Sequence, residues 1–143
     1  MKSLKALTEH LRSLKLTDED CFDSWVEKGE LEPRNAVLTA GFDAPVSLFG
    51  SIPYTAVLDW ENWHGSAYDL FFHVMQWLYE HDYDFDAMGN PTFSAVVPDD
   101  EVANVQITIR FVELIYESGG RRVDAPTPNT IDDIAVICNH AAH

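Results

Sequence analysis

Three segments of the chain repeat apolar residues at helical spacing, and each segment predicts a helix. The first spans residues 4–14. The second runs from Thr17 to Gly29 and begins with residues at the spacing of a capping box. The third begins at Ser66, also with capping-box spacing, and ends near His81. The apolar stripes consist of Leu4, Leu7, Leu11 and Leu14, then Cys21, Phe22, Trp25 and Val26, then Leu70, Phe71, Val74, Met75, Trp77 and Leu78.

Four other segments are rich in β-branched and aromatic residues or alternate between apolar and polar positions, which predicts strands. They are residues 35–42, 54–60, 93–97 and 102–116. The order helix, helix, two strands, helix, two strands indicates an α+β fold. We expect a largely antiparallel sheet with the third helix, the main one, packed on one face, together with two N-terminal helices.

The length of 143 residues fits one domain of ordinary size. We expect a single α+β domain over residues 1–120. Residues 121–143 are expected to form a proline-containing linker and a C-terminal extension with a possible short strand. Because an apolar peptide on such a linker can add to the edge of another sheet, Ile134, Val136 and Ile137 are candidate interface residues.

The charge balance excludes several classes of partner. Lys and Arg number nine against twenty-four Asp and Glu, which gives a formal net charge of −15. Because a surface this acidic repels phosphate groups, we expect neither direct nucleic-acid binding nor docking on an anionic membrane. No apolar run reaches the roughly 20 residues of a membrane-spanning helix, and the N-terminus lacks the apolar segment of an export signal. Apolar residues make up 46% of the chain, enough for a folded core.

Candidate chemistry is sparse. Asp82, Asp84 and Asp86 have the spacing that opens a calcium loop, but Ala87 and Phe93 stand where that loop needs glycine and glutamate. We therefore interpret the loop as a solvated acidic turn. The histidines and cysteines show no paired spacing of a zinc site, and no nucleophile or phosphate-loop motif occurs. We expect no metal, no cofactor and no enzymatic activity.

Two tryptophans close to one turn are candidates for an interface. Trp60 and Trp63 flank a predicted strand end and a turn that also carries Glu61. Aromatic side chains within a polar rim are typical of protein interfaces. The alternative is that both indoles pack under the neighbouring helix, and the sequence leaves the two interpretations even.

An ordered set of residues is similar to the tail completion protein R family of contractile-tailed temperate phages. It covers about residues 4–138, and its motifs are single aromatics, a Trp-Leu pair and a strand pattern. The chain departs from the family at residues 61–64, where the family is shorter. The residues that carry the resemblance are Trp25 to Gly29, Phe42, Tyr54 to Trp60, Trp77-Leu78, Asp82, Asp84, Phe93, Asp99-Asp100, Val105 to Ile109, Glu113 and the apolar segment Ile134 to Cys138.

The resemblance implies a structural virion protein of the phage tail, present in the host cytoplasm during assembly. Family members are taken to act at the head-proximal end of the tail, where they stop growth of tube and sheath and prepare the tail to join the head. Tail terminators of this kind are α+β subunits in rings, commonly hexamers. The implied partners are other copies of the chain, tube and sheath proteins and head-tail connector proteins. No catalytic residue comes with the family.

In a ring, the uneven charge distribution could have a role in the passage of DNA. No Lys or Arg occurs between residues 35 and 109, where eleven carboxylates lie. Carboxylates around a narrow channel would repel phosphate and let DNA pass without holding it. The candidate channel-facing residues are Asp82, Asp84, Asp86, Asp99 and Asp100. Plain solubility is the competing explanation.

Two other functions fit parts of the sequence. A small acidic binding or inhibitor module that mimics DNA would explain the charge, but it would not explain the strand and helix pattern shared with the tail family. A small metal-dependent hydrolase would need ligand and catalytic motifs that the sequence does not show.

Overall fold

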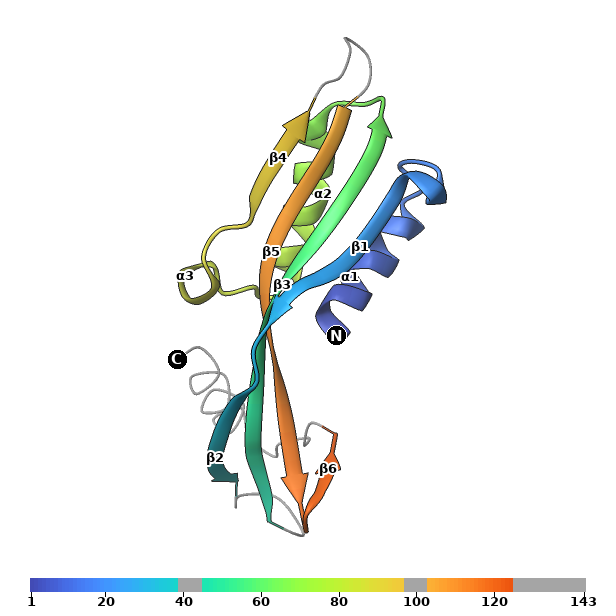
Figure 1. The fold of residues 1–143 in the computed structure, drawn as a ribbon. Helices are drawn as coiled ribbons and strands as arrows, with labels where there is room; N and C mark the ends of the chain where they lie inside the picture. Colours follow the sequence, from blue (N-terminus) through green and yellow to red (C-terminus); the bar gives the residue numbers. More distant parts are fainter. Residues whose placement is uncertain (39–44, 97–102, 125–143) are drawn as a thin grey trace. The chain divides into compact units, whose positions relative to one another are not determined.

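The structure is a computed structural model and describes residues 1–38, 45–96 and 103–124 (Figure 1). Its helical elements are α1 (Lys2–Ser13), the short 3-10 helix η1 (Glu19–Cys21), α2 (Ala67–Glu80) and α3 (Phe85–Met88). Its strands are β1 (Phe22–Gly29), β2 (Glu32–Leu38), β3 (Val46–Trp63), β4 (Thr92–Val96), β5 (Ala103–Ser118) and β6 (Arg121–Val123). None of the helices in these ranges is long and apolar enough to span a membrane.

The fold is α+β, with a mostly antiparallel sheet of six strands. The main path through the sheet is β1-β3-β5-β4, while β2 also pairs with β3 and β6 with β5. The pairs β2–β3, β4–β5 and β5–β6 are antiparallel. The α+β prediction with a largely antiparallel sheet is therefore confirmed.

The described residues group into two compact units that share the two long strands. Unit 1 consists of Met1–Lys28 and Thr55–Phe111, and unit 2 of Gly29–Tyr54 and the residues from Val112 onward. Because β3 and β5 contribute to both units, the strands at their sides differ: β1 and β4 in unit 1, β2 and β6 in unit 2.

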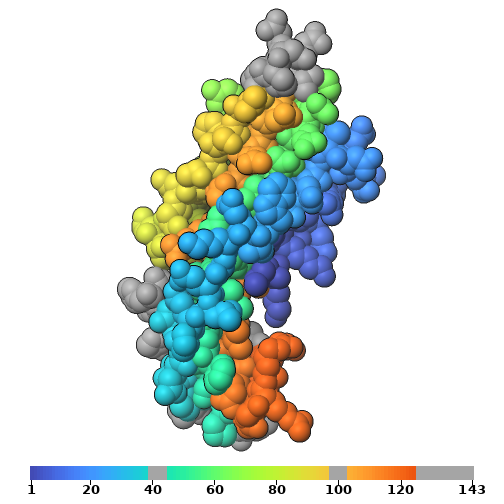
Figure 2. All heavy atoms as spheres, in the orientation of Figure 1, coloured from blue at the N-terminus to red at the C-terminus, as the bar shows by residue number. Residues whose placement is uncertain are grey.

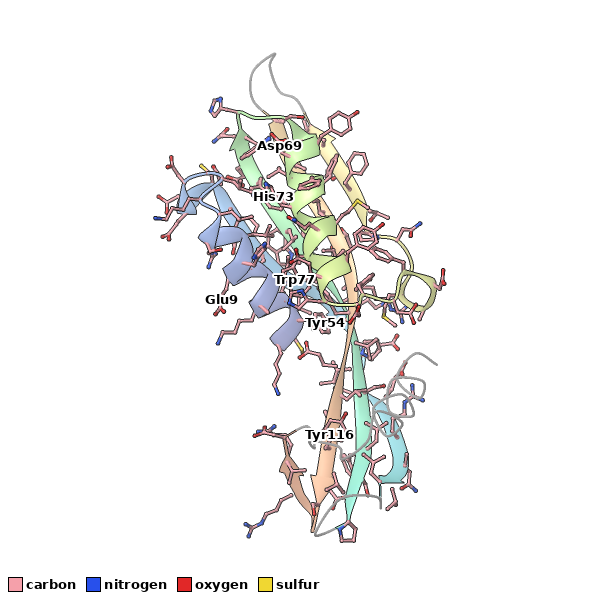
Figure 3. All side chains as sticks on the ribbon, turned by 180° about the vertical axis from the view of Figure 1, so that it is seen from behind. Glu9, Tyr54, Asp69, His73, Trp77 and Tyr116 are labelled. Carbon is pink, nitrogen blue, oxygen red and sulfur yellow. The ribbon has the colours of Figure 1, made fainter. Side chains whose placement is uncertain are left out.

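Unit 1 is a four-stranded sheet with α1 and α2 on the same face (Figures 1 and 3). Its strands β4 and β1 form opposite edges, yellow and blue in Figure 2, with β3 and β5 between them. The predicted alternation in β5 is correct, since its odd positions from Val105 to Phe111 are buried and the positions between them are more exposed. The helices bury Leu7 and Leu11 from α1 and Leu70, Val74 and Leu78 from α2.

Helix α2 begins where its cap predicts. Ser66 Oγ accepts a hydrogen bond from the backbone N–H of Tyr68 at 3.2 Å, and Asp69 places negative charge in the first turn. Both features stabilise a helix start, because the first N–H groups have no partner inside the helix and carry partial positive charge.

Unit 2 contains the β2–β3 pair and the β5–β6 hairpin. Its apolar cluster has Leu48 and Tyr116 at the centre. Gly119 and Gly120, with φ of +61° and +78°, form the two-residue turn between Ser118 and Arg121. Such a turn needs positive φ at both central residues and so favours glycine. The extension that we expected from residue 121 thus begins with a strand, while residues 125–143, with Ile134, Val136 and Ile137, lie outside the described residues.

The predicted second N-terminal helix, Thr17 to Gly29, is wrong. Its first turn forms only η1, and the rest forms strand β1. Phe22 is buried and stacks on Trp60 of β3, with ring centroids 4.7 Å apart, and the hydroxyls of Ser24 and Thr8 lie 2.7 Å apart. Pairing with β3 makes this segment a strand, because a local helical pattern does not outweigh the burial gained against strands that come later in the chain.

Candidate functional site

The two candidate tryptophans lie inside unit 1. Trp60 is 1% exposed and Trp63 is 7% exposed, so both indoles are packed in the interior of the chain. Glu61, which lies between them in the sequence, is exposed. The indole of Trp63 lies so close to the backbone that a Cβ atom on Gly65 would come within 2.6 Å of Trp63 Cζ2. The glycine therefore permits this packing. Neither ring offers its face to a partner in this arrangement.

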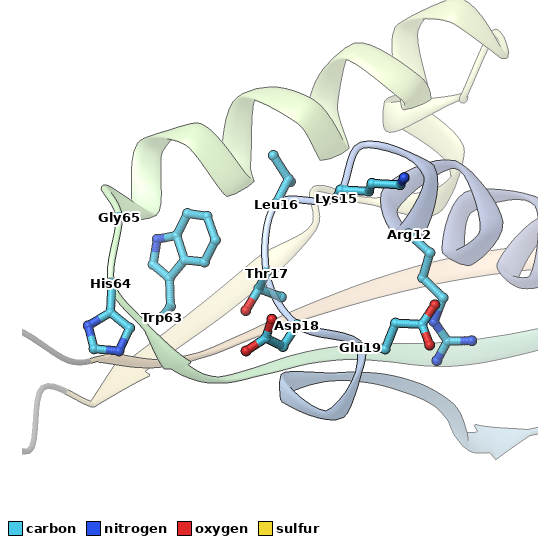
Figure 4. Close-up of a pocket in the computed structure, with 9 residues that line it drawn as sticks. All are labelled: Arg12, Lys15, Leu16, Thr17, Asp18, Glu19, Trp63, His64 and Gly65. Atoms are coloured by element: carbon cyan, nitrogen blue, oxygen red, sulfur yellow. The ribbon is translucent and has the colours of Figure 1, made fainter.

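A pocket of about 710 Å³ lies beside Trp63 (Figure 4). Its charged side chains are mixed in sign, with Arg12 and Lys15 against Asp18 and Glu19. The indole Nε1 of Trp63 is buried and finds no acceptor among the described residues. These groups do not form a nucleophile with its base, and the described residues contain no cluster of three or more metal-ligating side chains. The remaining lining residues are Leu16, Thr17, His64 and Gly65.

The acidic loop after α2 is a structured turn. Asp84 caps α3, since its Oδ1 accepts a hydrogen bond from the backbone N–H of Ala87 at 3.0 Å. Asp82 adopts a left-handed conformation with φ of +52°, and Asp82, Asp84 and Asp86 are all exposed. The structure thus assigns Asp84 a local structural role, while Asp82 and Asp86 remain available as surface charges. Asp99 and Asp100 lie outside the described residues.

Tyr83 fixes this loop to the sheet of unit 1. Its hydroxyl donates a hydrogen bond to the carbonyl oxygen of Arg110 at 2.6 Å, and its ring packs edge-on against Phe111. Burial raises the pKa of the Tyr83 phenol to about 12, because a phenolate at this position would lose hydration.

Helix α2 carries an exposed apolar face that the sequence interpretation missed. We call Tyr68, Phe72, Met75 and Tyr79 the aromatic face; their exposed fractions are 81%, 61%, 43% and 64%. Their spacings of four, three and four residues place them on one side of the helix. The apolar stripe predicted for α2 includes Met75, which the structure leaves exposed. The missed signal is that α2 is apolar around most of its circumference, more than one buried face requires.

The comparison with known families identifies the chain as a phage tail protein. The family model described as P2 phage tail completion protein R (GpR) matches residues 1–119. The chain therefore belongs to this family of tail completion proteins, as the resemblance predicted. No curated protein and no solved structure matches the chain significantly.

Membership in this family supports a role in tail completion and a structural component of the virion tail. It also favours a structural over an enzymatic protein. The match covers both units, since residues 1–119 contain all of unit 1 and the long strands of unit 2.

Proposed function

We propose that the chain caps the head-proximal end of a contractile phage tail, stops growth of the tube and sheath, and prepares the tail to join the head. The observation that carries this proposal is the family match over residues 1–119. The partners would be the tube and sheath proteins on one side and head-tail connector proteins on the other. The protein would act first in the host cytoplasm, where tails assemble.

We further propose that the cap is a hexameric ring of identical subunits, with carboxylates towards the channel. The support is the charge distribution, since residues 35–109 contain no Lys or Arg. Asp82 and Asp86 are exposed, and neither forms an ion pair with another of the described residues. Carboxylates confined between low-dielectric walls would lower the affinity of the channel for DNA phosphates.

The capping function is tested with a phage that lacks this gene and is supplied with the protein from a plasmid. We expect tails of uncontrolled length, or tails without heads, in electron micrographs of the deletion strain. The plasmid should restore tails of normal length with heads attached. Normal, head-bearing tails in the deletion strain would show that the protein does not complete tails.

The channel proposal is tested by reversing charges that serve no local structure. Asp82→Lys combined with Asp86→Lys leaves the Asp84 cap of α3 intact. We expect this variant to build tails of normal length but to release DNA more slowly, because the added cations bind phosphate. Glu30→Lys, which reverses an exposed charge of unit 2, is the control. If both variants release DNA at the wild-type rate, the carboxylates of this loop do not face the channel.

A further inference from the structure

The aromatic face of α2 is costly to leave in water. Three of its four side chains are more than half exposed, and they lie on one side of a single helix. Core positions of the same helix, Leu70 and Leu78, are fully buried on other sides of the helix. A contiguous apolar surface of this kind on a soluble protein marks a site of interaction.

This surface continues onto the edge strand β4. Phe71 joins the two, since its ring centroid lies 6.3 Å from that of Tyr68 and 4.6 Å from that of Phe93 on β4. Phe93 and Val96 are exposed. Strand β4 is last in the path β1-β3-β5-β4, and its sequence contains no charge. An uncharged edge strand lacks the usual protection against pairing with another chain.

The opposite edge of unit 1 carries bases beside its carboxylates. Strand β1 is first in the same path and exposes Trp25 and Val26. Helix α1 presents Lys2, Lys5 and Arg12 on its outer side, at spacings of three and seven residues, with the exposed carboxylate Glu9 among them. The guanidinium carbon of Arg12 lies 5.7 Å from the ring centroid of Phe22, so this basic side adjoins β1.

Charge complementarity selects the occupant of the aromatic face. The charges of α2 are the carboxylates Asp69 and Glu80, and no base occurs from residue 35 to 109. A partner therefore needs an apolar surface with basic residues beside it. The α1 and β1 edge of a second copy offers both, since Trp25 and Val26 are exposed on β1 and the bases lie on the adjoining α1.

We propose that two copies of this chain join head to tail, with the aromatic face and β4 edge of one copy against the α1 and β1 edge of the next. The two surfaces are different, so the contact is heterologous, and repetition of it produces a closed ring or an open filament. The choice of a ring rests on the proposed capping function. The contact itself rests on exposure, edge position and charge.

The first experiment compares two variants that each add one carboxylate to the exposed side of α2. Phe72→Asp breaks the aromatic face, and Gln76→Asp is the matched control at an exposed polar position of the same helix. Sedimentation velocity is measured up to about 1 mM protein, where weak contacts are still populated. We expect wild type and Gln76→Asp to form assemblies and Phe72→Asp to lose at least tenfold in association. A monomeric wild type, or equal association of the two variants, would overturn the proposal.

The second experiment tests the head-to-tail geometry. Lys5→Glu reverses a base on α1, and Arg121→Glu makes the same change at an exposed base of unit 2 as a control. We expect Lys5→Glu alone to associate weakly. Mixed one to one with Phe72→Asp, it should form two-chain complexes and nothing larger, because only one intact pair of surfaces remains. A mixture that stays monomeric contradicts a heterologous contact, as does an Arg121→Glu variant that is as weak as Lys5→Glu.

Failure of this inference can be told from failure of the capping function. If Phe72→Asp associates like its control and only loses binding to the tube protein, the contact between copies is wrong while capping stands. If the deletion strain makes normal tails but association still depends on Phe72, the contact stands and capping is wrong.

Discussion

Unit 1 and unit 2 use the same two long strands and are stabilised in different ways. Unit 1 has helices over one face of its sheet and buries a large set of apolar side chains, Trp60 and Leu58 among them. In the described part of unit 2, the buried apolar side chains are Leu48, Pro53, Tyr54 and Tyr116. Hydrophobic stabilisation scales with apolar area removed from water, so unit 1 should hold most of the free energy of unfolding.

Unit 2 adds a polar network to its small cluster. Ser51 is buried opposite Glu32 in the β2–β3 pair. Its hydroxyl lies 3.2 Å from Glu32 Oε2 and 3.3 Å from Arg34 Nε, and the Arg34–Glu32 ion pair measures 2.8 Å. One pair of strands can therefore belong to a packed core in one unit and to a ribbon of low stability in the other, because the layers that cover the strands determine their stability.

The largest effect is expected in the core of unit 1. Leu78→Ala removes a fully buried side chain and should lower the free energy of unfolding by about 2–5 kcal/mol, measured by urea denaturation. Phe72→Ala, an exposed position on the same helix, is the control and should change it by less than about 0.5 kcal/mol. Similar losses in the two variants would mean that the aromatic face is part of the core.

A smaller effect is expected in unit 2. Leu48→Ala should lower the free energy of unfolding by about 2 kcal/mol, the low end for such a change, because all of its neighbours in the cluster except Tyr116 are only partly buried and can close the space. Amide hydrogen exchange should show the lost protection in unit 2, with unit 1 nearly unchanged. The adjacent and exposed Phe49→Ala is the control. An equal loss of protection in unit 1 would show that the two units unfold as one.

Ser51→Ala tests the polar network. It should cost about 1 kcal/mol, because the ion pair of Glu32 and Arg34 survives and both side chains can still reach water. The measurement is again the exchange rate of amides in β2 and β3. Ser47→Ala on the same strand serves as control. If Ser51→Ala had an effect as large as that of Leu48→Ala, the network would contribute more to stability than we expect.

The smallest effect is a dependence on alkaline pH confined to unit 1. The pKa of Tyr83 is raised from 10.0 to about 12, so folding favours the protonated phenol. This contribution is complete below about pH 10 and is lost as the pH rises towards about 12. Urea midpoints should therefore fall between those values, and less steeply in Tyr83→Phe. An identical fall in the variant would assign the dependence to other groups.

Sequence reasoning succeeded where the signal is local. Ser66 caps α2, Gly119 and Gly120 turn the chain, and the alternation of β5 identifies its buried side. It failed for Phe22 to Gly29, where apolar residues at helical spacing lie in a strand, because pairing with β3 depends on residues far along the chain. The family could be recognised from sequence because an ordered set of aromatics and strand residues survives without any single strong motif.

The candidate surfaces divide in the same way. The sequence does not decide between core and interface for Trp60 and Trp63, because it does not reveal what covers a turn. The structure buries both inside unit 1. The aromatic face of α2 is not evident from the sequence, because α2 has more apolar residues than one buried side requires. The sheet beneath the helix determines which of these residues remain exposed to water.

The α+β class, the family, the start of the main helix and a central region without positive charge can all be read from the sequence, since they depend on residue types and short spacings. The edge positions of the strands, the exposure of the aromatics and the carboxylate that caps a helix become known only from the folded structure. These depend on contacts between segments far apart in the chain, and their energies are invisible to local patterns.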